Sequence, residues 1–245
     1  MFIAERKMLV VTGYPRKGQS QVETFNSIGQ AKQCNSIEKY PLEISGAQGG
    51  VVNDQVVICG GTTTGDNSGA RSQCYKLSQN GQWSPLGAGL KKSRSRGAAA
   101  PVNIKGQEFL WITGGGDSSG NQLKTTVLVS ERSGVVSAGK ELPEARIGHC
   151  MLALGKYVMV IGGFVDGVWQ KSVLVYDTEN GFSYKEGTPM NYARARHSCS
   201  TMKSPAHEGR TVAVVAGSDF GDGKDTAEIL DFDISGGAWE LSEYL

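Results

Sequence analysis

One pattern recurs five times along this chain of 245 residues. Each copy has an apolar run that ends in glycine, a polar loop and a second apolar run, which usually closes on an aromatic residue. The repeat glycines are Gly13, Gly61, Gly115, Gly163 and Gly217, so neighbouring copies lie 48, 54, 48 and 54 residues apart. Self-similarity at such a period predicts an array of like units, each of which buries its apolar faces against its neighbours.

Each copy divides into four β-strands, which we call a to d. Strand b is the continuous apolar run before the glycine, a pattern typical of a strand buried on both faces. Strand a has small residues, as expected for inner strands that converge on an axis. Strand d centres on Cys34, Trp83, Val136, Tyr184 and Trp239 in the five copies. Large rings there would wedge between units, so we expect looser packing at Cys34 and Val136.

Five units of four antiparallel strands predict an all-β fold with one domain over residues 1–245. The units would span about 1–40, 45–88, 95–142, 146–190 and 194–245. In the short first unit, Phe2 to Ala4 would supply strand a. Because a ring of units removes exposed strand edges only when it closes, three arrangements remain: a closed ring, which we favour, a fragment of a larger ring, and closure by another chain.

Composition narrows the function classes. Lys and Arg total 25 against 24 Asp and Glu, so no global charge favours a nucleic acid or a membrane surface as partner. No apolar run is long enough to span a membrane, and charges interrupt the first residues where a signal peptide would be apolar. We expect a cytoplasmic protein, or a secreted one if a leader has been removed. The five cysteines show no CxxC spacing, so we expect buried thiols rather than disulfides or a zinc site.

The chain resembles the kelch-repeat β-propellers over essentially its whole length. The glycine pairs after strand b, the strand-c aromatics and the strand-d tryptophans carry the match. Two further segments, Arg146-x-x-His149 and Arg194-x-x-His197, are similar to the family's Arg-x-x-His entry into a blade. In earlier units this pattern fades to Arg94-x-x-Gly97 and Ile44-x-x-Ala47. The resemblance implies a kelch-type propeller fold of about five blades, and it is less specific for function, because such propellers serve as adaptors, actin binders and enzymes.

Kelch geometry would place two kinds of connection on one face. The d–a segments, which lead from strand d of one unit to strand a of the next, are basic. The b–c loops, which join strands b and c of one unit, are acidic. One interpretation is a mouth that grips a carboxylate or an acidic peptide. Its binding residues would be Arg94, Arg96, Arg146, Arg194 and Arg196. The other interpretation pairs each arginine with an aspartate of its own or the next b–c loop. We favour this structural role for Arg146 and Arg194, whereas Arg96 and Arg196 are freer to bind a partner.

Aromatic residues in the b–c loops are the second group of candidates. Tyr14 and Phe164 directly follow a repeat glycine, and Trp169 and Phe220 lie deeper in their loops. An exposed aromatic ring beside arginine is typical of a binding hot spot. The alternative is that these rings fold over the neighbouring blade.

No catalytic set, metal site or cofactor is predicted. The three histidines, His149, His197 and His207, come without a matching cysteine pattern, and the first two occupy repeat positions that favour a structural role. We therefore predict a scaffold that binds a protein or peptide partner through its loop face. The alternative is a small-ligand or sugar-acid binding protein or enzyme with an Arg-lined axial pocket, similar in fold to the kelch-type sialic-acid mutarotase. A structural, homo-oligomer-forming role is the third.

Overall fold

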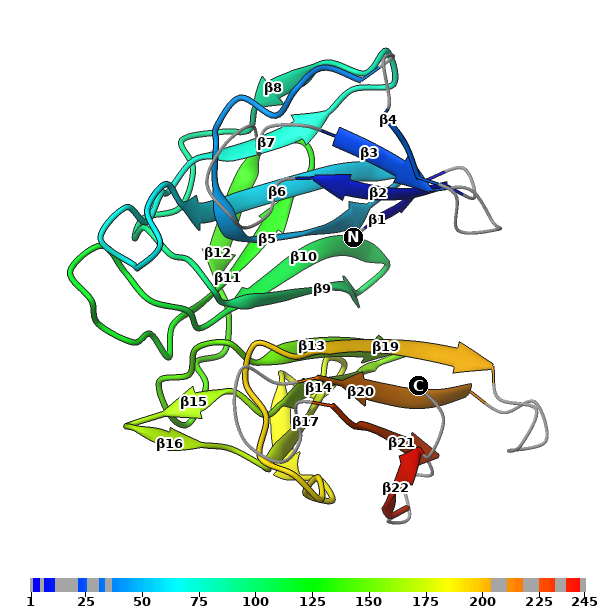
Figure 1. The fold of residues 1–245 in the computed structure, drawn as a ribbon. Helices are drawn as coiled ribbons and strands as arrows, with labels where there is room; N and C mark the ends of the chain where they lie inside the picture. The colour runs from blue at the N-terminus through cyan, green and yellow to red at the C-terminus, as the bar shows by residue number, and fades with distance from the viewer. Residues whose placement is uncertain are drawn as a thin grey trace. The chain divides into compact units, whose positions relative to one another are not determined.

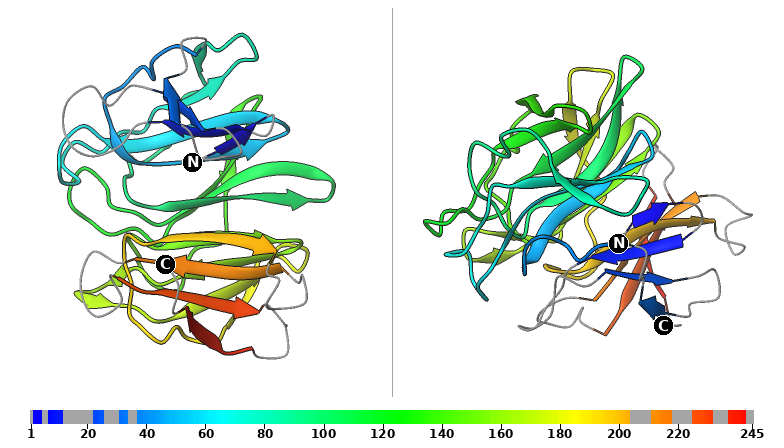
Figure 2. Two further views of the ribbon diagram at one scale, coloured as in Figure 1. Left: turned by 45° about the vertical axis from the view of Figure 1, so that its right-hand side comes forward. Right: turned by 90° about the horizontal axis from the view of Figure 1, so that it is seen from above.

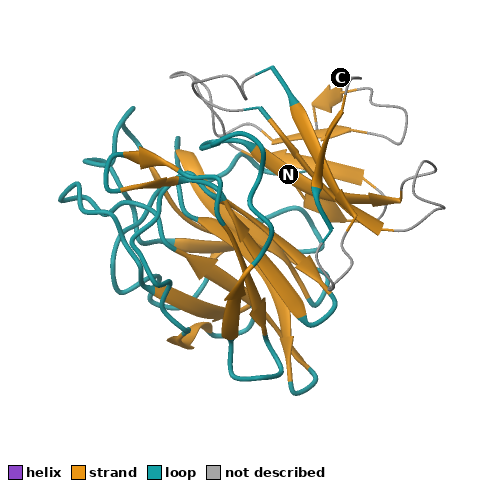
Figure 3. Ribbon diagram, turned by 90° about the horizontal axis from the view of Figure 1, so that it is seen from below, coloured by secondary structure: helices purple, strands orange, loops and turns teal. Residues whose placement is uncertain are grey.

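The computed structural model describes residues 2–4, 7–11, 22–25, 31–33, 37–203, 211–217, 225–231 and 237–242. Every regular element in these ranges is a β-strand, and loops connect the strands (Figure 3). None of these residues belongs to a helix long and apolar enough to cross a membrane. The contacts divide the chain into two compact units, Met1–Pro143 and Glu144–Leu245, which are described separately.

Unit 1 contains three antiparallel sheets of four strands, which we call blades 1 to 3 (Figure 1). Blade 1 consists of β1 (Phe2–Ala4), β2 (Lys7–Val11), β3 (Val22–Phe25) and β4 (Ala31–Gln33). Blade 2 consists of β5 (Ser45–Val52), β6 (Gln55–Thr62), β7 (Cys74–Leu77) and β8 (Trp83–Pro85). Blade 3 consists of β9 (Ala98–Ile104), β10 (Gln107–Thr113), β11 (Thr126–Ser130) and β12 (Gly134–Ala138). The short strand expected at Phe2 to Ala4 is present as β1.

Unit 2 contains blades 4 and 5. Blade 4 consists of β13 (Cys150–Leu154), β14 (Tyr157–Ile161), β17 (Val173–Asp177) and β18 (Ser183–Glu186). A two-stranded ribbon, β15 (Phe164–Val165) and β16 (Val168–Trp169), forms its b–c loop. Blade 5 consists of β19 (Ser198–Lys203), β20 (Thr211–Ala216), β21 (Ala227–Asp231) and β22 (Trp239–Ser242), which follow one another from orange to red in Figure 2. The described residues thus form one four-stranded sheet for each sequence repeat.

The apolar runs of strand b are continuous because both faces of the strand are buried. In β6, Val57 and Cys59 belong to a cluster that includes Leu110 of blade 3. Val56 and Ile58, which alternate with these residues along the strand, belong to a second cluster. Successive side chains of a strand point to opposite faces, so one strand packs in two cores. The double burial predicted for strand b is confirmed in blade 2.

The strand-d tryptophans bind the connection that precedes their own blade. The buried Trp83 donates from Nε1 to the carbonyl oxygen of Glu38 at 3.0 Å. The buried Trp239 donates in the same way to Thr188 at 2.9 Å. Each indole therefore buries its ring and satisfies its polar atom. The looser packing predicted at Val136 is confirmed, because this side chain is 46% exposed.

The expectation of reduced thiols is wrong for four of the five cysteines. Cys59 and Cys74 lie opposite each other on the paired strands β6 and β7 and form a disulfide. Cys150 on β13 and Cys199 on β19 form a second disulfide, which joins blade 4 to blade 5. Cys34 lies outside the described residues. The sequence spacing missed both bonds because each depends on which residues the strands bring face to face, not on a local motif.

Candidate functional site

Three of the predicted binding arginines are in the protein interior. Arg94, Arg146 and Arg194 occupy equivalent positions before blades 3, 4 and 5, and they are 2%, 1% and 0% exposed. Each donates from Nη1 to the carbonyl oxygen of the glycine after strand b of its own blade: Gly114 at 2.9 Å, Gly162 at 2.6 Å and Gly217 at 3.0 Å. Burial lowers the pKa of Arg94 to about 10 and also lowers the pKa of Arg146.

Each of these arginines also binds the hydroxyl residue that precedes strand c. The contacts run to Thr125 Oγ1 at 3.2 Å, Ser172 Oγ at 2.9 Å and Thr226 Oγ1 at 2.7 Å. One guanidinium therefore ties the entry segment of a blade to the ends of strands b and c. The interpretation of these three arginines as partner-binding residues is not supported, because their side chains are buried and their Nη groups bond oxygens of their own blades. The acceptors common to all three are carbonyl and hydroxyl oxygens, and the acids near two of them are Glu228 at Arg194 and Glu144 at Arg146, not the loop aspartates that the structural interpretation named.

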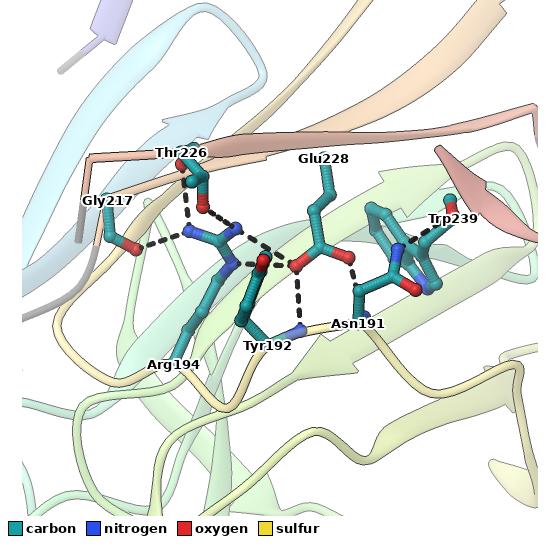
Figure 4. A network of polar contacts seen from close by, with 7 residues as sticks. All are labelled: Asn191, Tyr192, Arg194, Gly217, Thr226, Glu228 and Trp239. Atoms are coloured by element: carbon teal, nitrogen blue, oxygen red, sulfur yellow. Dashed lines mark hydrogen bonds and ion pairs between the residues drawn. The ribbon is translucent and has the colours of Figure 1, made fainter. Parts of the chain in front are cut away.

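Blade 5 adds a buried acid to this arrangement (Figure 4). Glu228 on β21 is 0% exposed, and its Oε1 accepts hydrogen bonds from Arg194 Nε at 3.1 Å and Nη2 at 3.0 Å. The same oxygen accepts from the backbone N–H of Tyr192 at 3.1 Å, and Oε2 accepts from that of Asn191 at 2.6 Å. Asn191 in turn donates from Nδ2 to the carbonyl oxygen of Trp239 at 2.8 Å. The network fixes the segment before blade 5 against its outer strands.

The other two arginines, Arg96 and Arg196, share an unusual backbone conformation with two glycines. The equivalent positions before blades 2 to 5 are Gly46, Arg96, Gly148 and Arg196, with φ of 61°, 56°, 66° and 55°. Arg96 donates its N–H to Gly46 O at 2.8 Å, and Arg196 donates to Gly148 O at 2.6 Å. The left-handed region costs a non-glycine residue roughly 1–2 kcal/mol. Glycine would adopt this conformation at a lower free-energy cost, so an arginine at the position indicates that its side chain makes a contact of its own.

The structure gives these two arginines different surroundings. Arg96 is half-buried and donates from Nη2 to Gly65 O and from Nη1 to Asn67 Oδ1, so it braces the b–c loop of blade 2. In that loop, hydrogen bonds from Ser68 and Thr64 lower the pKa of Asp66, and the charge of Arg96 adds to the effect. Arg196 is exposed. Partner binding by both arginines stays a prediction, and of the two only Arg196 is exposed to solvent.

The aromatic residues predicted in blade 4 come together on the ribbon. β15 and β16 pair through Phe164 and Trp169, whose rings meet edge to face with centroids 5.8 Å apart. Asp166 and Gly167 make the turn with φ of 45° and 86°, as in the favoured two-residue hairpin turns. Val168, beside the turn, is 59% exposed. Val168 was not among the predicted binding residues, although an Asp-Gly pair between apolar residues is a hairpin signal.

Backbone hydrogen bonds attach the ribbon to the entry segments of blades 4 and 5. Phe164 N donates to Ile147 O at 2.8 Å, and Ile147 N donates to Phe164 O at 3.1 Å. The next residue, Gly148, accepts from Arg196, and a Cβ at Gly148 would lie 3.2 Å from Arg196 Cγ. We call Ile147, Phe164, Val168, Trp169 and Arg196 the ribbon surface. It combines partly exposed apolar side chains with an exposed cation within unit 2.

The remaining candidate sites and residues lie outside the ribbon surface. A cavity of about 400 Å³ opens between the a–b and c–d turns of blade 3 and Asn53 in the a–b turn of blade 2. Its only arginine is Arg132, which lies at the opposite end of the blade from the segments predicted to bind. Tyr14 and Phe220 fall outside the described residues. Within the described ranges, no three His, Cys, Asp or Glu side chains gather closely enough to hold a metal ion.

A family model described as the kelch motif matches residues 145–182. The matched segment begins beside Arg146 and contains the ribbon and strands β13 to β17 of blade 4. No curated protein matches the chain. Together with the four-stranded sheets, the match confirms the kelch resemblance and the kelch-type propeller fold class.

Proposed function

We propose that this kelch-repeat chain is a protein-binding scaffold whose partner docks on the ribbon surface of blade 4. One observation carries the proposal: the ribbon holds apolar side chains outside the four-stranded sheet, and it is bonded to Ile147, whose neighbour Gly148 accepts the N–H of the exposed Arg196. A two-stranded ribbon is marginal by itself, so its attachment to Ile147 gives the binding residues a fixed position. A rigid position lowers the entropy cost of binding.

The chemistry of the ribbon surface suggests the partner. Phe164 and Trp169 offer a preformed aromatic pair, and Val168 adds apolar area at the turn. Arg196 can bind a carboxylate through two parallel N–H donors. The best match is a peptide segment or loop with a large apolar residue close to an aspartate or glutamate.

The small-ligand alternative has less support in the structure. It requires Arg94, Arg146 and Arg194 to line a pocket, but their side chains are buried and bonded to their own blades. The cavity of blade 3 is lined by Glu108 and Glu131 beside Arg132, whose Nε already pairs with Glu131 at 3.2 Å, so this lining does not suit a sugar acid.

Selection of random short peptides on the purified protein tests the proposal. We expect the selected peptides to combine an apolar residue with an acidic one. Trp169→Ala should weaken their binding about 30-fold, because truncating a hot spot costs about 2 kcal/mol. The matched control is Tyr184→Ala, which truncates an exposed aromatic residue on the outer strand β18. If the selected peptides bound Trp169→Ala and Tyr184→Ala equally well, the assignment of the ribbon surface would be wrong.

A further inference from the structure

The disulfide between Cys150 and Cys199 links two blades rather than two strands of one sheet. Cys150 begins β13, the inner strand of blade 4, and Cys199 lies in β19, the inner strand of blade 5. Their Cα atoms are 6.1 Å apart, within the usual range for a disulfide. The bond joins residues 49 positions apart. Opening it would remove the covalent link between neighbouring blades while each sheet kept its own hydrogen bonds.

A histidine lies against one of the two sulfur atoms. His197 Nε2 is 3.2 Å from Cys150 Sγ. The ring is buried against Gly162, where an added Cβ would lie 2.8 Å from its Cε1 atom. Desolvation, with a smaller contribution from the charge of Arg194, lowers the pKa of His197 to about 4. The ring is therefore neutral near pH 7 and carries a single N–H.

The surroundings of the ring indicate which nitrogen carries that hydrogen. His197 Nδ1 is buried and has no hydrogen-bond partner. A buried N–H without an acceptor is costlier and rarer than an unfilled lone pair. The hydrogen therefore belongs on Nε2, where it points at Cys150 Sγ. This arrangement supplies a hydrogen-bond donor to a thiolate that forms on Cys150.

The two cysteine residues also differ in exposure. Cys150 is buried, whereas Cys199 is partly exposed. Thiol–disulfide exchange starts when a thiolate attacks one sulfur atom, and its rate rises when the departing sulfur is a better leaving group. Accessibility favours attack at Cys199, and the imidazole N–H favours departure of Cys150.

We propose that Cys150–Cys199 is a thiol-exchange site that accepts a small monothiol, with His197 as the positioning residue that stabilises the departing Cys150 sulfur. The thiolate of the first monothiol bonds to Cys199 Sγ, the Cys150–Cys199 bond breaks, and the electron pair leaves with Cys150. The thiolate of a second monothiol attacks the mixed disulfide at the bound sulfur. Two monothiols are thereby oxidised to their disulfide, Cys199 leaves as a thiolate, and two cysteines are reduced. The two protons released by the monothiols end on Cys150 and Cys199.

The second disulfide of the chain is the matched control. Cys59 and Cys74 are 0% and 2% exposed, so neither sulfur is open to attack in the folded protein. Reduced glutathione is the probe, and alkylation followed by mass spectrometry of the peptides measures each bond separately. We expect Cys150–Cys199 to open at least about tenfold faster than Cys59–Cys74. Equal rates, or free Cys150 and Cys199 before any glutathione is added, would overturn the proposal.

Two variants test the histidine. His197→Phe keeps a ring but removes the N–H donor, and it should slow the opening of Cys150–Cys199 about tenfold. His197→Gln restores a side-chain N–H and should recover part of the rate. The rate at Cys59–Cys74 reports on folding in the same sample, because this bond becomes accessible only when the protein opens. If His197→Phe opened Cys150–Cys199 as fast as the unaltered chain while Cys59–Cys74 stayed protected, the role of His197 would be refuted.

Discussion

Replacing Glu228 by glutamine isolates the energetic role of the buried acid in blade 5. The carboxylate accepts four hydrogen bonds, from two guanidinium nitrogens of Arg194 and from the N–H groups of Tyr192 and Asn191. Both charged side chains are 0% exposed. Glutamine keeps one acceptor oxygen but places an NH₂ group where the second oxygen stood. That group must face a donor, either the N–H of Asn191 or the guanidinium.

The expected loss of stability follows from this geometry. Removing one partner of a buried ion pair usually costs about 3–5 kcal/mol. We expect a loss at the lower end of this range, about 3 kcal/mol. The equivalent Arg94 and Arg146 stay buried although their hydrogen bonds run only to carbonyl and hydroxyl oxygens, so a buried arginine at this position does not require a carboxylate. Arg194 would keep the same acceptors, Gly217 and Thr226. For a chain of this length, 3 kcal/mol corresponds to a decrease in Tm of about 6–12 °C.

Urea unfolding and calorimetry of Glu228→Gln measure this loss. The control is Glu144→Gln, since Glu144 is 58% exposed and its carboxylate lies 3.8 Å from Arg146, a contact that should contribute under about 0.5 kcal/mol. Blade 2 has the buried Ile44 where blade 5 has Arg194, and blade 4 has Leu174 where blade 5 has Glu228. The double variant Arg194→Ile with Glu228→Leu should therefore be more stable than Glu228→Gln alone. A Glu228→Gln loss no larger than that of Glu144→Gln would refute the reasoning.

Three further predictions concern His197, Cys59–Cys74 and Arg196. Because burial lowers the pKa of His197 from 6.5 to about 4, the unfolded chain binds a proton between these values that the folded chain excludes. Stability should fall by up to about 3 kcal/mol as the pH drops through that window, and urea unfolding of His197→Phe should show a smaller decrease. The disulfide Cys59–Cys74 closes a loop with a sequence separation of 15, so replacing both cysteines by alanine should lower the free energy of unfolding in urea by about 3 kcal/mol. Arg196→Gly copies the glycine that precedes blade 4, Gly148, at a positive φ; calorimetry should show stability unchanged or raised by up to about 1 kcal/mol, while binding of acidic peptides weakens.

The sequence repeats predicted the positions of the strands well, because the burial of apolar side chains determines where the strands lie. The continuous apolar run around Val57 and Cys59 predicts a strand buried on both faces, and the structure confirms it. The strand-d positions of Trp83 and Trp239 were predicted for the same reason, since a large ring must be buried where a repeat offers space. These features depend on the order of residue types along the chain, which a sequence displays directly.

The roles of the polar residues could not be predicted in the same way. Arg146 would have the same place in the repeat whether it pointed to solvent or to the carbonyl oxygen of Gly162. The direction of its side chain depends on the backbone of the entry segment, which the sequence does not reveal. The bond between Cys150 and Cys199 depends likewise on the placement of two blades. The ribbon was accessible to prediction, because Asp166-Gly167 is a hairpin signal that the repeat pattern obscured.

Hydrogen–deuterium exchange with and without a selected peptide tests the binding role of the ribbon surface most directly. The account predicts protection at Ile147 and across the ribbon from Phe164 to Trp169, because a docked segment would exclude water from these amides. The amide of Arg196, which donates to Gly148 O next to Ile147, should gain protection as well. Protection confined to other segments, such as Gly106 to Phe109 beside the cavity of blade 3, with none at the ribbon, would contradict the account.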